Sequence, residues 1–164
     1  LEEVVKSYDG APALRGIDLQ IGRGEIFGFL GPNGAGKTTA IRCILDLIRP
    51  TSGSIRVFSV DAQASPEWVR SCSGYLPGEL HFDDNLTARK VLELLDSLRI
   101  GKTDWKFVDT LCERLDLDNT RAIKNLSKGN KQKVGVIQAI MHRPEILLLD
   151  EPTVGLDPLM QQEV

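Results

Sequence analysis

Residues 31 to 39 read GPNGAGKTT, and this stretch decides the fold. Its first and sixth positions are glycines, followed by Lys37 and Thr38, which satisfies the pattern G-x-x-x-x-G-K-[ST]. A chance match in a chain of this composition has a probability of roughly one in a hundred or less. The stretch follows an apolar run at 24–30 and opens a segment at 37–48 with apolar residues at helical spacing. A strand, a glycine-rich loop and a helix in this order predict a phosphate-binding loop.

The residue types in this loop suit a nucleoside triphosphate. Glycines let successive backbone N–H groups turn toward phosphate oxygens, and the helix N-terminus adds partial positive charge. Lys37 is expected to reach the β- and γ-phosphates, and the Thr38 hydroxyl to ligate Mg²⁺. A turn that merely caps a helix explains the glycines but not the Lys-Thr pair. A dinucleotide fold is poorly supported, because Phe27 stands where the third glycine of G-x-G-x-x-G belongs.

The composition is that of one soluble globular domain or a little less. The chain has 164 residues, of which 41% are hydrophobic and 26% charged. Its 23 acidic and 20 basic residues argue against a broad nucleic-acid-binding surface. No apolar run approaches the roughly 18 residues of a membrane span. The acidic N-terminus is not a signal peptide, and the lack of an initiator Met suggests a trimmed chain or a fragment.

The cysteines and histidines do not follow a metal-binding pattern. Cys43, Cys72 and Cys112 are far apart and odd in number, which favours reduced thiols with no ligand role. His81 and His142 have no nearby Cys or carboxylate pattern, and we expect them to be structural or solvated.

Strand-like and helical segments alternate along the chain. Three strand-like runs at 1–8, 16–21 and 24–30 come first, and residues 49–60 return to turn and strand. The stretch 85–125 is predicted to be mostly helical, with two amphipathic helices. Their apolar faces are, at 87–99, Val91, Leu92, Leu95 and Leu98, and, at 104–116, Trp105, Val108, Leu111, Cys112 and Leu115. We expect Trp105 to be a core residue and no platform for a ligand.

The run PEILLLDEP at 144–152 is short, apolar and stopped by charges and proline, which predicts a buried parallel strand. The whole pattern favours an α/β core with a helical insertion. A parallel strand beside that of the phosphate loop would deliver Asp150 to Mg²⁺, for which carboxylate oxygens are suitable ligands. Glu151 follows, in a position to orient or deprotonate an attacking water. Pro152 is expected to hold Glu151 in an extended backbone.

Residues 126 to 130, LSKGN, have two interpretations. Ser127 before a helical pattern is an ordinary helix cap, or the stretch is half of an active site. An L-S-x-G element at 126–129, only 23 residues before Asp150, together with the loop at 31–38 and LLLDEPT at 147–153, resembles the motifs of ATP-binding cassette (ABC) ATPases. VGLDP at 154–158 resembles that family's D-loop.

The resemblance covers nearly the whole chain and implies the family's fold. That fold is α/β: a P-loop NTPase core with an antiparallel β-subdomain and an inserted α-helical subdomain that carries the signature. It implies a single domain over 1–164, incomplete at the C-terminus, with core and β-subdomain at about 1–75 and 135–164. The helical subdomain would span about 80–134. The chain stops before the strand that carries the family's switch histidine.

The resemblance also implies an active site shared by a head-to-tail dimer. Lys37, Asp150 and Glu151 would be the catalytic residues, with Thr38 and Asp150 on Mg²⁺. ATP would contact residues of both subunits, the signature acting on the partner's γ-phosphate and an upstream aromatic stacking on adenine. These nucleotide-binding residues are Tyr8, Gly31, Asn33, Gly34, Ala35, Gly36, Lys37, Thr38, Thr39, Ser127 and Gly129. On its own, Tyr8 would be interpreted as a core or edge-strand tyrosine.

Within the family, GYLPGEL at 74–80 and EPTVGLDP at 151–158 look most like ABC-2 type exporter ATPases of bacteria and archaea. Such a protein would work at the cytoplasmic face of the membrane and power a separate permease for drugs, antibiotics, lipids, polysaccharides or ions. No nucleic-acid partner is expected. The alternatives are a soluble ABC ATPase that acts on ribosomes or DNA, and a nucleotide-dependent regulatory module.

Two motifs depart from the family pattern, LSGGQ and the Q-loop. Lys128 replaces the first glycine of the signature and Asn130 its glutamine. Lys128 either adds charge near the γ-phosphate or lies along the dimer surface. Gly78 stands where the Q-loop glutamine is expected, followed by Glu79. Glu79 either takes over a contact to Mg²⁺ or water, or is a solvated loop charge.

Overall fold

The computed structural model describes residues 1–99, 101, 103–153 and 155. The chain forms two compact units, Leu1–Arg70 and Ser71–Val164, which are described in turn. No helix within the described ranges is both long and apolar enough to cross a bilayer. The elements of the first unit are β1 (Glu2–Tyr8), β2 (Ala11–Ile17), α1 (Lys37–Ile44), β3 (Ser52–Ser54), β4 (Arg56–Val57) and β5 (Val60–Asp61), and α2 (Pro66–Cys72) leads into the second.

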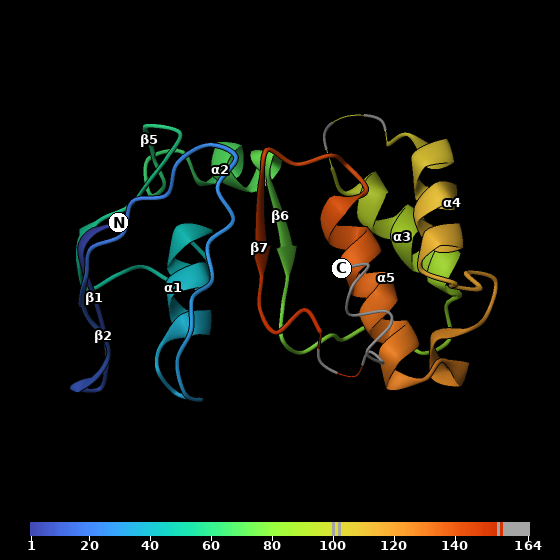
Figure 1. The fold of residues 1–164 in the computed structure, drawn as a ribbon, viewed down its shortest axis with the longest axis horizontal. Coiled ribbons are helices and arrows are strands. Elements are labelled where there is room, and N and C mark those ends of the chain that lie inside the picture. The colour runs from blue at the N-terminus through green and yellow to red at the C-terminus, as the bar shows by residue number, and fades with distance from the viewer. Residues whose placement is uncertain (100, 102, 154, 156–164) are drawn as a thin grey trace. The chain divides into compact units, whose positions relative to one another are not determined.

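The first unit is built on an antiparallel sheet of order β2-β1-β3 (Figure 1). The predicted strand at 1–8 is confirmed as β1. The strand predicted at 16–21 is mostly wrong, because β2 runs from Ala11 to Ile17 and residues 18–21 have no strand assignment. β2 begins at Ala11 because Asp9 and Gly10 form a two-residue turn. Both turn residues have positive φ, 47° and 85°, as type I′ hairpin turns require, and Tyr8 therefore pairs directly with Ala11.

The prediction of a strand at 24–30 is wrong for the residues that the structure describes. This run has no strand assignment, and Ile26 and Leu30 are almost fully exposed. A strand needs a neighbour to receive its backbone hydrogen bonds, and among the described residues no segment pairs with this run. The sequence at 24–30 thus shows an apolar run, but it does not show whether another segment pairs with that run.

The helix predicted at 37–48 is confirmed as α1 but ends at Ile44. Asp46 adopts a left-handed conformation with φ 49°, and the Leu47 N–H then donates to the Arg42 carbonyl at 2.9 Å. This closure, five residues back along the chain, is a common way to end a helix.

The second unit contains a parallel strand pair and a helical bundle. Its elements are β6 (Ser73–Leu76), α3 (Ala88–Ser97), α4 (Trp105–Arg114), the 3₁₀ turn η1 (Ile123–Asn125), α5 (Lys128–Ile140) and β7 (Ile146–Leu149). β6 and β7 run parallel and in register, from Ser73 opposite Ile146 to Leu76 opposite Leu149. α5 packs closely on β6, since a Cβ at Gly74 would lie only 2.0 Å from the Ala139 carbonyl oxygen.

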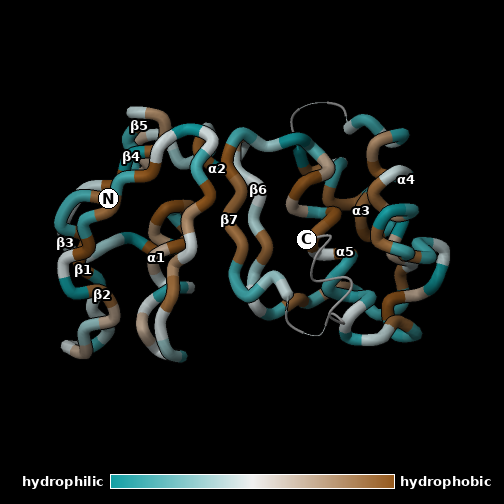
Figure 2. The backbone as a smooth tube through the Cα atoms, in the orientation of Figure 1, coloured by the Kyte–Doolittle hydropathy of each residue, from teal (hydrophilic) through white to brown (hydrophobic). Residues whose placement is uncertain are grey.

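The parallel strand predicted at the end of the chain is confirmed as β7, but it is not fully buried. Leu147 is 42% exposed. Among the described residues β6 is the strand that pairs with β7, so the other edge of β7 lacks cover from a neighbouring strand. Figure 2 shows β7 as apolar along its length, turning hydrophilic at its end.

The helical stretch predicted at 85–125 is confirmed by α3, α4 and η1. Thr87 and Asp104 cap α3 and α4 with their side-chain oxygens. Leu98 departs from the prediction and is exposed, because α3 ends at Ser97 and the helical face ends with it. The predicted apolar faces otherwise meet in one core, whose most buried members include Leu92, Val108, Ile123, Val134 and Ile137.

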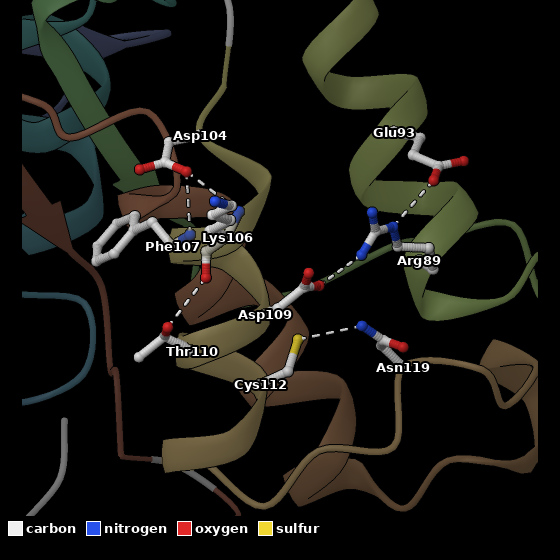
Figure 3. A network of polar contacts seen from close by, with 9 residues as sticks. All are labelled: Arg89, Glu93, Asp104, Lys106, Phe107, Asp109, Thr110, Cys112 and Asn119. Carbon is white, nitrogen blue, oxygen red and sulfur yellow. Dashed lines mark hydrogen bonds and ion pairs between the residues drawn. The ribbon is translucent and has the colours of Figure 1, made fainter.

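A polar network ties α3 to α4 (Figure 3). The Arg89 guanidinium donates to Asp109 at 2.6 Å and to Glu93 at 2.9 Å. It also lies 4.2 Å from the ring centroid of Trp105, which is half-buried against the core. Trp105 is thus a packing residue, as expected.

Candidate functional site

The phosphate-loop candidate lies in the first unit, where residues 31–36 lead into α1. Gly36 precedes the helix with φ 92°, and no side chain caps the first turn. The first N–H groups of α1 therefore lack an internal acceptor and suit an anion. The Lys37 ammonium folds back over the loop, where it donates to the carbonyls of Gly31 at 2.7 Å and Pro32 at 3.0 Å.

The rest of this loop is open to solvent. The side chains and backbone of Asn33, Gly34 and Ala35 are exposed, whereas Thr38 and Thr39 are half-buried in the first turn of α1. One ammonium, two hydroxyls and the backbone N–H groups of the first helical turn thus gather at one helix start. Such a set of donors binds a polyanion, and the predicted loop is locally formed as expected even though its preceding strand is not.

Tyr8 ends β1 and is 46% exposed. The Lys6 ammonium lies 5.0 Å from its ring centroid. The interpretation of Tyr8 as a core tyrosine is therefore wrong. β1 is also the middle strand of its sheet, so Tyr8 is not on an edge strand. An exposed aromatic ring at a strand end is available for stacking.

In the second unit, Asp150 closes β7 beside the loop that follows β6. The Asp150 N–H continues the ladder by donating to the Leu76 carbonyl at 2.9 Å, and the residue is buried. Gly78 faces it: a Cβ at position 78 would lie 3.6 Å from the Asp150 carboxylate carbon and Oδ2. A side chain at this position would lie next to the carboxylate. Glycine places no side chain there.

The Glu79 side chain lies in solvent. It is almost fully exposed and lies 3.8 Å from the equally exposed His81 ring. The structure therefore places Glu79 as a solvated loop charge, and His81 is solvated as predicted.

Glu151 is exposed and adopts a left-handed backbone with φ 53°. The prediction of an extended backbone is wrong. The residue before a proline avoids the right-handed helical region, and the turn at 151–153 uses the left-handed region instead. The segment therefore bends sharply as it leaves β7.

Ser127 caps α5, as one of its two interpretations predicts. Its Oγ accepts from the Asn130 N–H at 3.2 Å, and its carbonyl accepts from Lys131 N at 2.9 Å. Gly129 is half-buried and Lys128 exposed. The Lys128 stem lies along Gly155, since a Cβ at that glycine would be 3.2 Å from the Lys128 Cγ.

Gln132 joins α5 to the segment after β7, and the sequence interpretation missed it. The residue is buried, and its amide nitrogen donates to the carbonyls of Pro152 at 3.1 Å and Glu151 at 3.4 Å. A signal was present in the sequence, because helical spacing puts Gln132 on one face with Val136 and Ala139, which are both buried. A polar residue on a buried face needs a hydrogen-bond partner.

The remaining titratable candidates are structural. Burial raises the pKa of the thiols of Cys43, Cys72 and Cys112, and all three are buried and form no disulfide. Burial, and then the charge of Arg99, lowers the pKa of His142, whose Nε2 lies 3.1 Å from the Ser73 carbonyl. Within the described ranges no cluster of three or more His, Cys, Asp or Glu side chains is placed to hold a metal.

Comparison with known proteins agrees with this geometry. The profile of the family described as ABC transporter matches residues 14–154. The chain is 37% identical over 164 residues to the bacitracin transport ATP-binding protein BcrA of Bacillus licheniformis, covering 99% of this chain and 53% of the relative. It is 39% identical over 163 residues to the daunorubicin resistance ATP-binding protein DrrA3 of Streptomyces coeruleorubidus, covering 97% and 52%. The chain thus spans about half the length of the curated relatives it matches.

Solved structures give the same fold. An ATP binding subunit of an ABC transporter superposes with a TM-score of 0.87 at 28% identity, covering 98% of this chain and 69% of that one. A dimeric bacterial ABC transporter cassette superposes with a TM-score of 0.86 at 24% identity, covering 99% and 77%. The predicted α/β P-loop fold with an antiparallel sheet and a helical insertion is confirmed.

Proposed function

This chain belongs to the ABC transporter family, and we propose that it binds and hydrolyses ATP to power export through a separate membrane permease. The observation that carries the proposal is the start of α1. There an uncapped helix N-terminus, a left-handed Gly36 and the folded-back Lys37 ammonium gather donors around one loop.

ATP would bind with its phosphates in this loop. Backbone N–H groups of the loop and of the start of α1 would donate to the β- and γ-phosphates, and Lys37 would exchange its two carbonyl partners for phosphate oxygens. Thr39 would add a hydroxyl in the first turn. The exposed Tyr8 ring would stack on adenine, which its 46% exposure permits.

Mg²⁺ fits the donor set that this chain offers. Asp150 is a buried carboxylate at a strand end, with a glycine and no side chain at position 78 beside it, and Thr38 would add a hydroxyl. Mg²⁺ in nucleotide sites takes one or two protein oxygens and completes its shell with water and phosphates. The ion would supply charge neutralisation to the phosphates. Glu151, one residue beyond Asp150, would orient or deprotonate the attacking water.

The open end of α5 would act on a second copy in a head-to-tail dimer. Ser127 and Gly129 sit at a helix start whose first turn contains no acidic side chain, so its partial positive charge is not offset there. These residues would contact the partner's γ-phosphate. Lys128, with its stem on Gly155, would lie along the dimer surface.

The membrane partner and the substrate class rest on the relatives. Two of them are named for bacitracin transport and daunorubicin resistance, which supports an antibiotic or drug as cargo and integral membrane permease subunits as partners. The protein would work at the cytoplasmic face of a prokaryotic cell membrane. A neighbouring reading frame with about six spans of roughly 20 apolar residues each is expected.

The test is Glu151→Gln in the purified protein, with Glu79→Gln as a matched control. Removing a general base lowers turnover by about 10²–10⁴-fold. We therefore expect Mg-ATP hydrolysis to fall at least about 100-fold in Glu151→Gln, with nucleotide affinity within about threefold of wild type. Glu79→Gln should leave both unchanged, because Glu79 lies in solvent. Normal turnover in Glu151→Gln would remove Glu151 from this role, and absence of Mg-ATP hydrolysis in wild type would refute the proposal as a whole.

A further inference from the structure

The first two turns of α5 hold the segment that follows β7 within the same chain. We propose that Gln132 is a positioning residue, which fixes the backbone at Glu151 and so directs the carboxylate that the proposed function assigns to the attacking water. The inference rests on that proposed role of Glu151. According to this inference, α5 of the same chain controls the geometry of Glu151.

The contact uses the full donor capacity of the Gln132 amide. Its nitrogen has two N–H groups, and the carbonyls of Pro152 and Glu151 accept at 3.1 Å and 3.4 Å. Gln132 is only 5% exposed, so water does not readily replace these bonds. Losing the amide would leave two carbonyl oxygens, both in partly buried hydrogen bonds, without this partner.

The backbone that Gln132 holds is strained. Glu151 has φ 53°, and a residue with a side chain rarely adopts this region unless its surroundings impose it. Within the described part of the chain, no hydrogen bond or ion pair is seen to fix the Glu151 carboxylate. The direction in which the side chain leaves the main chain is set by its backbone, and that backbone is held through the carbonyls of Glu151 and Pro152.

A second contact ties the same helix to the same segment. The Lys128 stem packs along Gly155, where a Cβ would approach its Cγ to 3.2 Å. Lys128 is the first residue of α5 and Gln132 the fifth, so both contacts come from one rigid end of one helix. A shift of this helix end would therefore act on Glu151, Pro152 and Gly155 together.

The experiment compares Gln132→Leu with Gln138→Leu, the same substitution on the same helix at a half-buried position that takes part in no described hydrogen bond. Hydrogen–deuterium exchange of a peptide covering residues 149–155 should quicken at least about threefold in Gln132→Leu and stay unchanged in Gln138→Leu. Steady-state turnover of Mg-ATP should fall about 10-fold or more in Gln132→Leu, with KM within about twofold. Gln132→Asn, which keeps the amide but withdraws it by one methylene, should change both quantities in the same direction and serves if the leucine variant does not fold.

Each possible result of this experiment either supports or overturns the positioning role of Gln132. Unchanged exchange at 149–155 in Gln132→Leu overturns the contact, and faster exchange with unchanged kcat overturns its role in positioning Glu151. Equal loss of kcat in the two leucine variants would mean a general effect on α5 and would also overturn the inference. Absence of hydrolysis in wild type refutes the proposed function instead, while the exchange measurement still tests the contact.

Discussion

Gly36→Ala tests whether the approach of β2 to the phosphate loop is as close as the structure has it. A Cβ at Gly36 would lie 2.5 Å from the Ala13 carbonyl oxygen and 2.7 Å from the Leu14 Cδ2. Forcing atoms into such a place costs about 1–3 kcal/mol. Alanine in the left-handed region costs a further ~1–2 kcal/mol. The stiffer unfolded chain offsets about 0.4–1 kcal/mol of this. The net loss is about 1–4.6 kcal/mol.

Gly10→Ala is the matched control. Gly10 has φ 85°, close to the 92° of Gly36, but no atom lies within 4 Å of its Cβ position. Only the backbone terms apply there, and they leave a loss of about 0–1.6 kcal/mol. Both glycines belong to the first unit, and so does Trp68. Its fluorescence in a Trp105→Phe background reports urea unfolding of this unit, measured without nucleotide.

The test compares the losses in free energy of unfolding of the two variants. We expect Gly36→Ala to lower the free energy of unfolding by at least about 1 kcal/mol more than Gly10→Ala, because only the first meets the β2 backbone. Nucleotide affinity should fall in Gly36→Ala and stay near wild type in Gly10→Ala. Equal losses of stability would show that Ala13 and Leu14 do not press on the loop, and the reasoning would fail.

Three further predictions concern the second unit. Arg89→Ala should lower the free energy of unfolding by about 1–2 kcal/mol, since two partly exposed ion pairs and one stacked ring are lost; a double-mutant cycle with Asp109→Ala that gives no coupling would contradict it. His142→Gln should lose less stability than wild type between pH 7 and pH 5 in urea titrations. The lowered pKa of His142 in the folded state makes its contribution complete above about pH 6.5 and lost as the pH falls, and equal slopes would refute this. Ser127→Asp should keep the stability of α5 but abolish ATP-driven dimerisation, measured by sizing; dimerisation at the wild-type level would contradict the role of Ser127 in trans.

Local patterns predicted the elements whose causes are local. Asp104 and Ser127 start helices by hydrogen bonds to N–H groups two or three residues ahead, so the sequence alone contains both partners. The prediction of a strand at 24–30 failed because its cause is not local. Its apolar residues are visible in the sequence, but a strand exists only with a neighbour, and sequence periodicity does not say which segment that neighbour is.

The residues of the candidate site also differ in whether their causes lie nearby in the sequence. The motif shows in the sequence that a glycine and then a lysine start α1, and the structure adds that Gly36 has φ 92° and that Lys37 donates to the Gly31 carbonyl. The contact of these residues with nucleotide stays a prediction. Glu151 was expected to be extended, because Pro152 was the only constraint visible near it. Its left-handed backbone is accompanied by two hydrogen bonds from Gln132, which lies 19 residues earlier and meets it only in the folded chain. The sequence shows a polar residue on a buried face, but not which carbonyls it serves.

The geometry at Ser127 removes the conflict between its two interpretations. As a cap, its Oγ accepts one hydrogen bond from the Asn130 N–H, and that uses an acceptor site only. The hydroxyl proton remains to donate to an oxyanion, and the first N–H groups of α5 point the same way. Aspartate preserves the acceptor and so the cap, but it has no proton at neutral pH and repels phosphate. A cap residue that is also a donor is therefore what this position requires if α5 both begins here and meets a partner's nucleotide, and serine meets both requirements.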